Sequence, residues 1–455
     1  MEILVLLLFF AGYTAIVMEH QLKLDKLIPA LLMMVLAWVA ISLGLDQIQY
    51  WFTSEEGLFT LTSDDNRMAL LKSALNAHFE ETAEILIFLI GAMTIVELVD
   101  YFNGFSVIKG FVKTNKKRTL LWVIAGLAYI LSSIIDNLTA TIVLITILRK
   151  LLANHNDRMW FAGIIIIAAN AGGAWSPIGD VTTTMLWIGD KVTAQKLMEY
   201  IFIPSLFCVG IPTLIASFLK PFQGNFELPE EEPVNRNAKI MLYLGLGMII
   251  FVPVLKMLTN LPPYLGMMFS LAVVATVAEI KTRQERALVL DTELGLQEMP
   301  LENSSEISTV HKNPTYHALS RIEMPSILFF LGILMAVGAL ESLGIIIQFG
   351  ETVSANIGED FFVIILGFAS AIIDNVPLVA ASMGMFNDPI DADVWHLIAY
   401  SAGTGGSLLI IGSAAGVVAM GMEKIPFFWY FKKISWLALL GFLGGTAFFF
   451  IESIF

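Results

Sequence analysis

The chain has 455 residues, of which 57% are hydrophobic and only 15% are charged. Soluble domains usually carry about 45–50% apolar and about 25% charged residues, so the composition argues against a water-soluble enzyme. Acidic residues (40) outnumber Lys and Arg (26), and the formal charge of −14 argues against a nucleic-acid partner, which needs a basic face. The apolar residues form runs long enough to cross about 30 Å of hydrocarbon, which predicts an all-α polytopic membrane protein.

The expected elements, in chain order, are about ten full spans and two interrupted apolar stretches. The first run starts after Glu2 alone, without the basic start of a signal peptide, so we expect it to be a retained span. Residues 44–83 should form an acidic outer loop with an amphipathic helix around 66–79, and 102–117 an interfacial helix. The predicted spans are 3–19, 27–43, 84–100, 159–188, 199–219, 240–258, 264–280, 323–345, 394–422 and 427–451.

Two apolar stretches, 119–153 and 361–386, are each split near the middle by Asp-Asn without a loop. The arms of the second stretch, 361–373 and 376–386, reach only about 20 and 17 Å as helix, which predicts a re-entrant hairpin. The arms of the first reach about 25 Å, so length decides less there. Basic residues flank both of its ends, however, which predicts that both ends are cytoplasmic.

Orientation follows from the rule that cytoplasmic loops carry the excess of Lys and Arg. With the N-terminus outside, 21 of the 26 Lys and Arg fall on the cytoplasmic side. The outer loops then hold Arg67, Lys72, Lys191 and Lys196, and Lys256 lies near a helix end. We therefore expect both termini outside, with the first hairpin entering from the cytoplasm and the second from outside.

An internal repeat matches this orientation. The motif Ser-x-Ile-Ile-Asp-Asn occurs at 132–137 and again at 370–375, and a glycine pair follows each copy in a later span. Each half has five crossings and one hairpin, and because five is odd the second half must be inverted. Inverted repeats with broken helices are a transporter architecture. The predicted domains are a first repeat over 1–219, a cytoplasmic linker over 220–239, and a second repeat over 240–455 with a cytoplasmic loop over 281–322.

The hairpin tips contain the first candidate ion ligands. A carboxylate inside hydrocarbon is unfavourable, so Asp136 and Asp374 are expected to face the bundle interior as functional groups. Asn137 and Asn375 follow them and add carbonyl oxygens and amide donors that can neutralise a free helix end. A helix cap in an exposed loop is the alternative for both carboxylates. Neighbouring hydroxyl groups complete the set: Ser132, Ser133, Thr139 and Ser370.

The span 159–188 cannot be a continuous helix, because it contains a Gly-Gly pair and Pro177. Its unwound carbonyl groups must be buried in protein or line a wet cavity. With nearby carboxylate and hydroxyl groups they make an all-oxygen environment suited to a hard cation, a packing kink being the alternative. A matching break interrupts 394–422. The candidate ligands at the two breaks are Asn170, Asp180, Thr182, Thr183, Ser407 and Ser413.

The two halves differ in charge, because Ser413 stands where the first half has Asp180. Glu84 and His78, at the start of the third span, are candidates for an outer proton or cation funnel, or belong to a solvated helix start. No Cys or His cluster has metal-site spacing, and no Walker-type loop occurs, so we expect no cofactor and no ATP-driven pump.

These motifs resemble those of the NhaD-type sodium/proton antiporters, in the ion transporter superfamily that also holds arsenite exporters and di- and tricarboxylate carriers. The resemblance rests on the two Ser-x-Ile-Ile-Asp-Asn hairpins and on Gly-Gly-Ala-Trp-Ser-Pro-Ile-Gly-Asp-Val-Thr-Thr at 172–183, and it covers nearly the whole chain. It implies export of Na⁺, with Li⁺ as a second cation, in exchange for H⁺ across a bacterial inner membrane. It also implies a homodimer that works by an elevator motion.

Carboxylate carriers of the superfamily have Ser-Asn-Thr at the hairpin tips, whereas Asp136 and Asp374 here would repel an anion. The leading hypothesis is therefore antiport, in which Na⁺ and H⁺ compete for midplane carboxylates and Asp136, Asn137, Asp180 and Thr182 hold the Na⁺. Two alternatives stay open. One is export of arsenite or sodium-coupled transport of a carboxylate, and the other is an intramembrane aspartyl hydrolase, which needs two facing aspartates.

Overall fold

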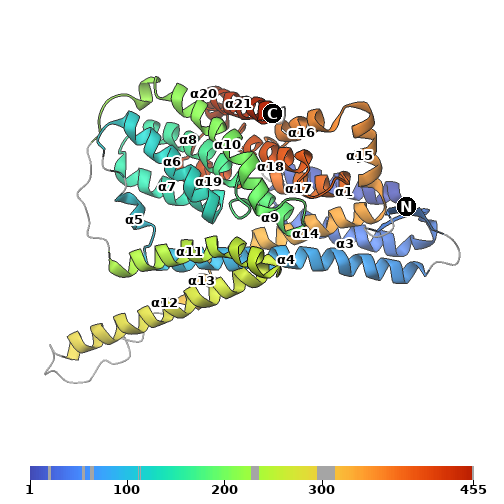
Figure 1. Ribbon diagram of the computed structural model, residues 1–455, viewed down its shortest axis with the longest axis horizontal. Coiled ribbons are helices and arrows are strands. Elements are labelled where there is room, and N and C mark those ends of the chain that lie inside the picture. Colours follow the sequence, from blue (N-terminus) through green and yellow to red (C-terminus); the bar gives the residue numbers. More distant parts are fainter. Residues whose placement is uncertain are drawn as a thin grey trace. The chain divides into compact units, whose positions relative to one another are not determined.

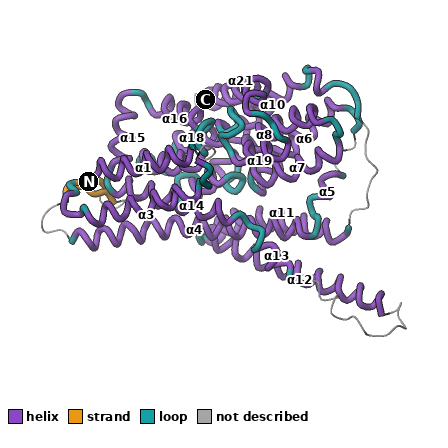
Figure 2. Tube along the Cα trace, turned by 180° about the vertical axis from the view of Figure 1, so that it is seen from behind, coloured by secondary structure: helices purple, strands orange, loops and turns teal. Residues whose placement is uncertain are grey.

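The computed structural model describes residues 1–18, 22–53, 57–61, 66–110, 112, 114–226, 235–294 and 313–452. Within these residues the chain is almost entirely helical (Figures 1 and 2). The one sheet among them is a two-stranded antiparallel hairpin, β1 (Tyr50–Thr53) and β2 (Gly57–Thr60), within the predicted outer loop. The chain forms two compact units: Met1–Leu86, Thr114–Pro229 and Met324–Phe455 make the first, and Ile87–Lys113 and Glu230–Glu323 make the second.

Among the described residues, six helices are long and apolar enough to cross a membrane, or seven spans if one bent pair is included, so the protein is a multi-pass membrane protein. The bent pair is α20 (Phe427–Lys433) and α21 (Ser435–Glu452), which meet at 52° where a single span was expected. The six are α4 (Arg67–Tyr101), α6 (Lys117–Ile135), α10 (Ala194–Ala216), α11 (Arg236–Thr259), α12 (Pro263–Leu294) and α14 (Met324–Ser342).

The other expected spans are short or broken helices. The first two, α1 (Glu2–Val17) and α3 (Leu27–Leu43), have 16 and 17 residues, or about 25 Å of helix. The interrupted spans are α8 (His155–Ala174) with α9 (Val181–Ile188), and α18 (Asp393–Gly405) with α19 (Ala414–Glu423). Each pair is separated by an irregular segment that contains the predicted break.

Some boundaries differ from the sequence-based expectation. α4 joins the expected amphipathic helix and the third span, because residues 80–83 contain no glycine or proline that would end it. The expected interfacial helix over 102–117 is reduced to α5 (Ser106–Lys109), after a turn in which Asn103 has a φ of 53°. α12 extends to Leu294, and the remainder of the predicted loop up to residue 312 lies outside the described residues.

Two helical hairpins carry the repeated motif in the first unit. α6 and α7 (Asn137–Leu151) are separated by Asp136 alone, and α6 is long enough by itself to be a candidate span. α16 (Glu359–Ala369) and α17 (Asn375–Met385) are separated by residues 370–374. The shorter elements of this unit are η1 (Leu45–Gln47), η2 (Lys220–Phe222) and α15 (Ile345–Asn356).

The core of the first unit is built around α8, whose residues from Phe161 to Ala174 are all buried. α8 packs against α6, α7, α10, α18 and α19, which lie together in Figure 1, and α18 packs against α16 and α17. Both hairpins therefore contact broken helices in one compact core.

Each broken helix passes close to the tip of the hairpin from its own half of the chain. A Cβ atom on Gly179 would lie 2.7 Å from the backbone oxygen of Ser132, and one on Gly412 would lie 2.6 Å from that of Ser370. These distances leave room for glycine only, so the same backbone contact occurs at corresponding positions of the two motifs.

The second unit is a smaller helical assembly. α11 and α12 pack along each other, and the part of α4 from Ile87 onward contacts both of them. α13 (Pro314–Leu319) packs on α12, where the side-chain amide of Asn313 donates a hydrogen bond to Glu279 at 2.9 Å. The candidate ligands all belong to the first unit.

Candidate functional site

The first hairpin turns at Asp136, whose backbone adopts φ 85° and ψ 154°. This region is otherwise populated almost only by glycine, so a non-glycine residue there indicates strain held by its surroundings. The carboxylate caps α7 by accepting hydrogen bonds from the Thr139 amide at 2.8 Å and the Thr139 hydroxyl at 2.9 Å. Asp136 is thus a helix cap, and it also lies at a break inside an apolar hairpin.

A buried chain of amides and a hydroxyl runs from the first hairpin to the second broken helix. The Asn137 amide donates to the side-chain oxygen of Asn170 at 3.1 Å, and the Asn170 amide donates to the Ser413 hydroxyl oxygen at 2.9 Å. All three side chains are buried. Asn170 therefore connects residues that belong to the two different halves of the sequence.

Asp180 is the buried carboxylate of the site, and it is 5% exposed. Its Oδ2 accepts hydrogen bonds from the Thr182 hydroxyl at 2.8 Å and from the Asn375 amide at 2.9 Å. The Thr183 hydroxyl donates to the backbone oxygen of Asp180 at 3.0 Å. Asp180 precedes α9 but its side chain makes no capping hydrogen bond, whereas Ser413 caps α19 by accepting from the amide of Gly416 at 3.2 Å. The carboxylate of Asp180 is therefore directed toward the other half.

Four helix breaks thus meet around these contacts. Asn137 begins α7, Asp180 precedes α9, Asn375 begins α17 and Ser413 precedes α19. Helix N-termini carry partial positive charge that favours carboxylates, and the helices that end at the same breaks leave carbonyl oxygens without intrahelical partners. Carboxylate, amide, hydroxyl and carbonyl oxygens make a donor set suited to a hard cation.

The second hairpin carboxylate has a different partner. Asp374 Oδ2 lies 2.9 Å from the ammonium nitrogen of Lys26, which directly precedes α3. Sequence reasoning missed Lys26, because a lysine at the start of an apolar run is the usual pattern of a span end. The structure instead brings it to a hairpin tip 348 residues away.

Other predicted hydroxyl groups donate to nearby backbone oxygens. Ser132 donates to Ala169 at 2.6 Å, and Ser370 makes the corresponding hydrogen bond to Ala402 at 2.7 Å, so each ties a hairpin to a broken helix. Ser133 and Ser407 donate to carbonyl oxygens three residues earlier in the chain. Their hydroxyl oxygens can still accept or coordinate, but their protons are already used within the protein.

The two access candidates lie on α4. His78 Nε2 lies 3.1 Å from the Ser342 hydroxyl oxygen of α14, and its ring contacts that of Trp38 in α3. Glu84 lies six residues further along α4. These contacts connect His78 to α3 and α14 rather than to the hairpin tips.

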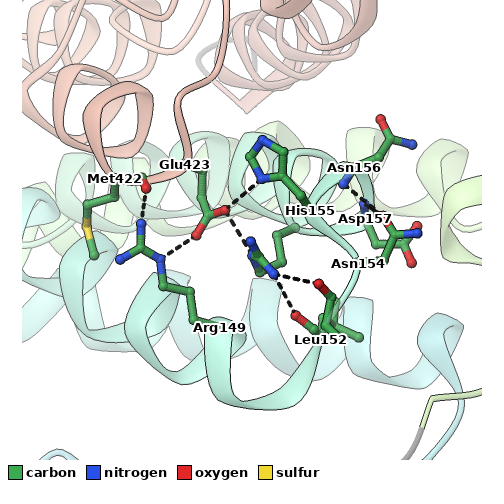
Figure 3. Close-up of polar contacts among 10 residues, drawn as sticks. Arg149, Leu152, Asn154, His155, Asn156, Asp157, Met422 and Glu423 are labelled. Carbon is green, nitrogen blue, oxygen red and sulfur yellow. Dashed lines mark hydrogen bonds and ion pairs between the residues drawn. The ribbon is translucent and has the colours of Figure 1, made fainter.

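A second polar cluster joins α7, α8 and α19, as Figure 3 shows. Glu423, the last residue of α19 and just beyond the predicted span, is 1% exposed in its side chain and accepts from Arg149 at 2.6 Å and Arg158 at 2.9 Å. His155 Nδ1 lies 3.3 Å from the same carboxylate. Burial alone would raise the pKa of Glu423, but the hydrogen bonds and charges of Arg149 and Arg158 outweigh it and hold that pKa below its usual range.

Comparison with known proteins adds a family. Residues 13–399 match the protein-family model CitMHS, described as citrate transporter. The chain is 40% identical over 454 residues to sodium/proton antiporter 1 of Arabidopsis thaliana, covering 98% of this chain and 72% of that protein. It is 37% identical over 449 residues to sodium/proton antiporter 2 of the same plant, covering 96% and 97%.

A bacterial relative and a solved structure complete the comparison. The chain is 30% identical over 444 residues to the Na⁺/H⁺ antiporter NhaD of Vibrio cholerae, covering 96% of this chain and 89% of that protein. The crystal structure of the YdaH transporter of Alcanivorax borkumensis superposes with a TM-score of 0.55 over 92% of this chain and 96% of that one. At 13% identity this likeness concerns the fold alone. The matched proteins are transporters and not enzymes.

Proposed function

The chain belongs to the citrate transporter family, and from this premise we propose that it is an antiporter that exchanges Na⁺ for H⁺. Its relatives at 30–40% identity carry that name over nearly the full length of this chain. The observation that carries the proposal is Asp180, a buried carboxylate that reaches across the two halves to Asn375.

The charge of the site favours a cation over the anion in the family description. Asp136 and Asp180 each lie at a helix break, and their carboxylates would repel a di- or tricarboxylate. Na⁺ is a hard cation that is bound well by carboxylate, hydroxyl and amide oxygens. We assign Asp136, Asn137, Asp180 and Thr182 to hold it, with Li⁺ as a second candidate.

Competition for the same oxygens would couple the two ions. A proton on Asp136 or Asp180 removes the negative charge that Na⁺ needs, and bound Na⁺ in turn disfavours protonation. A transporter that moves only when this location is occupied exchanges one ion for the other and needs no separate proton path.

The architecture that would support this exchange is a pair of inverted repeats. The matched contacts of Gly179 and Gly412 and of Ser132 and Ser370 support it. We propose 1–219 and 240–455 as the repeats, both termini outside, a bacterial inner membrane, and a homodimer in which the hairpins move with the broken helices.

An aspartyl hydrolase is less well supported than transport. It would need Asp136 and Asp374 to share a substrate or a proton. Asp136 instead accepts from Thr139, and Asp374 pairs with Lys26. Arsenite or carboxylate transport remains the alternative within the family, and a transport assay separates it from cation exchange.

Reconstitution tests the proposal directly. Purified protein in proteoliposomes with an acidic interior should dissipate the preset pH gradient when Na⁺ is added outside, and Asp180→Asn vesicles should not. Citrate and arsenite, supplied as salts of a non-transported cation, should have no effect. Uptake of either anion in wild-type and Asp180→Asn vesicles alike, without a response to Na⁺, would replace the proposal with anion transport.

A further inference from the structure

The two hairpin tips have the same motif but bind their carboxylates differently. Asp136 receives two hydrogen bonds from Thr139, one from its amide and one from its hydroxyl. The corresponding position in the second hairpin is Pro377, which has neither an amide hydrogen nor a hydroxyl. Within its own hairpin Asp374 accepts only a long hydrogen bond, from the amide of Val376 at 3.5 Å. The second carboxylate therefore needs a donor from elsewhere in the chain.

Lys26 supplies that donor from a defined position. Its ammonium nitrogen lies 2.9 Å from Asp374 Oδ2 and 4.5 Å from the ring centre of Phe329, a buried residue of α14. Attraction to the aromatic face and to the carboxylate hold the ammonium group from two sides. The side chains of Lys26 and Asp374 are 30% and 19% exposed, so the pair is only partly screened by solvent.

This pair lies directly beside the site. Asn375, the residue after Asp374, donates to Asp180, and the charge of Asp374 is close enough to act on Asp180. A positive charge at Lys26 therefore offsets a negative charge next to the proposed cation position. Without it, the three carboxylates of the two hairpins and the first break would all act on one ion.

We propose that Lys26 is the fixed counter-ion of the second hairpin and sets the affinity of the site for the transported cation. In this scheme, which rests on the proposed Na⁺/H⁺ exchange, Asp374 is neutralised by Lys26 and is not itself a ligand of Na⁺. Asp136 and Asp180 remain to bind the cation. Lys26 is a positioning and specificity-determining residue in this role, because it acts through Asp374.

The test removes the charge of Lys26 or of Asp374, and the two substitutions should change the affinity for Na⁺ in opposite directions. Half-saturating Na⁺ is measured in proteoliposomes at one alkaline pH, and Na⁺ binding to the solubilised protein is measured by calorimetry. Lys26→Gln should lower the half-saturating concentration several-fold, because Asp374 then adds its charge to the site. Asp374→Asn should raise it several-fold, because Lys26 then opposes the cation. The double variant should return toward the wild-type value, since both charges are removed together.

The controls separate a charge effect from damage to the fold. Lys23→Gln removes an exposed lysine of the same connection and should leave half-saturation unchanged. If Lys26→Gln does not fold, the comparison of Asp374→Asn with the double variant tests the inference. The double variant should then have a lower half-saturating Na⁺ concentration than Asp374→Asn, because it lacks the charge of Lys26.

Two results would overturn the inference. A double variant as weak as Asp374→Asn would make Asp374 a sodium ligand, and a loss of affinity in both single variants would make the pair a structural contact. A wild-type protein that shows no Na⁺-dependent proton movement would instead remove the proposed function itself.

Discussion

The side-chain amide of Asn375 donates a hydrogen bond to Asp180 Oδ2 at 2.9 Å, across 195 residues of sequence. This contact joins the tip of the second hairpin to the break of the first broken helix. The return contact runs from Asn170 in the first half to Ser413 in the second. Each half thus completes the polar environment of the other, so a change in one break should alter the hydrogen bonds of both.

Asp180→Asn tests the charge of the site. The amide keeps the shape of the side chain but removes the negative charge. In one of its two orientations it also places an NH₂ group, a donor, against the donors of Thr182 and Asn375. Loss of one partner from a buried charged contact costs about 2–5 kcal/mol, so the apparent affinity for Na⁺ should fall by about two orders of magnitude. Na⁺-driven dissipation of a pH gradient measures it. Asp46→Asn, at an exposed position, is the matched control, and normal exchange by Asp180→Asn at normal expression would refute the assignment.

Asn170→Ala should be more harmful than Ser413→Ala. Asn170 both accepts from Asn137 and donates to Ser413, so its removal leaves two buried polar groups without this partner, at about 1–3 kcal/mol each. Ser413→Ala removes a neutral hydroxyl that accepts from the amides of Asn170 and Gly416, but it leaves the hydrogen bond between Asn137 and Asn170 in place. We therefore expect it to weaken exchange by about fivefold, the equivalent of about 1 kcal/mol. Ser217→Ala serves as control, because it removes a buried hydroxyl directly after α10 that donates only locally, to the backbone oxygen of Leu214. Equal losses for the variants of Asn170 and Ser413 would contradict a bridging role for Asn170.

Local chemistry made the breaks predictable from the sequence. A polar pair within an apolar stretch cannot stay in a lipid-facing helix, and glycine pairs with Pro177 weaken helix locally, so the positions around Asp136 and Asp180 could be found without a structure. The all-α membrane fold and the transporter family were likewise predicted from composition and motifs, and both are confirmed.

The partners of these residues could not be predicted. Lys26 and Asp374 are separated by 348 positions, and the basic residue fits a span end equally well. Asp180 and Ser413 stand at corresponding positions of the two halves, but only Ser413 caps the helix that follows it. This difference depends on where each side chain points, which the alignment of the two halves does not predict. The bend between α20 and α21 occurs in a sequence without proline, and its one local signal is the pair Lys432 and Lys433 directly before it.

Glu423→Gln should lower thermal stability in a pH-dependent way. Its pKa is held below the usual range, so the ionised form stabilises the fold above the ordinary carboxyl pKa, and this stabilisation is lost as the pH falls through the lowered value. At neutral pH the loss should be about 3 kcal/mol, the low end for a broken buried pair, because Arg149 is 45% exposed. Melting curves in detergent from neutral pH to about pH 3, below the ordinary carboxyl pKa, should show the difference from wild type shrinking as acidity increases.

The matched control for Glu423 is Glu199→Gln. Glu199 is 58% exposed and pairs with Lys196 at 3.1 Å, and an exposed pair of this kind contributes at most about 1 kcal/mol. A constant deficit of Glu423→Gln at every pH would mean that packing, and not charge, is what the substitution removes.

Cysteine labelling tests the proposed orientation. Cys208 is the single cysteine and is buried, so Cys208→Ser provides a background without reactive thiols. Asn115→Cys, before the first hairpin, should react with a membrane-impermeant maleimide only after cells are permeabilised. Asn387→Cys, after the second hairpin, should react in intact cells, and both positions are exposed. The reverse pattern would invert the proposed topology.

Competition between Na⁺ and H⁺ for the same carboxylates predicts that pH changes the apparent affinity for Na⁺ and not the maximal rate. Na⁺ is expected to bind only after a proton leaves Asp180 or Asp136. The free energy needed to remove that proton therefore weakens the apparent binding of Na⁺. Below the pKa of the site, half-saturating Na⁺ should then fall about tenfold for each unit rise in pH, because one unit corresponds to about 1.36 kcal/mol. Above that pKa the half-saturating concentration should become constant. Initial rates of gradient dissipation at a series of Na⁺ concentrations and pH values give the half-saturating concentration and the maximal rate.

Variants that neutralise Lys191 or Lys196, which lie in a predicted outer loop, serve as controls. They should leave the dependence of half-saturating Na⁺ on pH unchanged. A half-saturating concentration that stays flat while the maximal rate changes would place the proton at a regulatory group, because a shared site cannot change its proton occupancy without changing its apparent affinity for Na⁺.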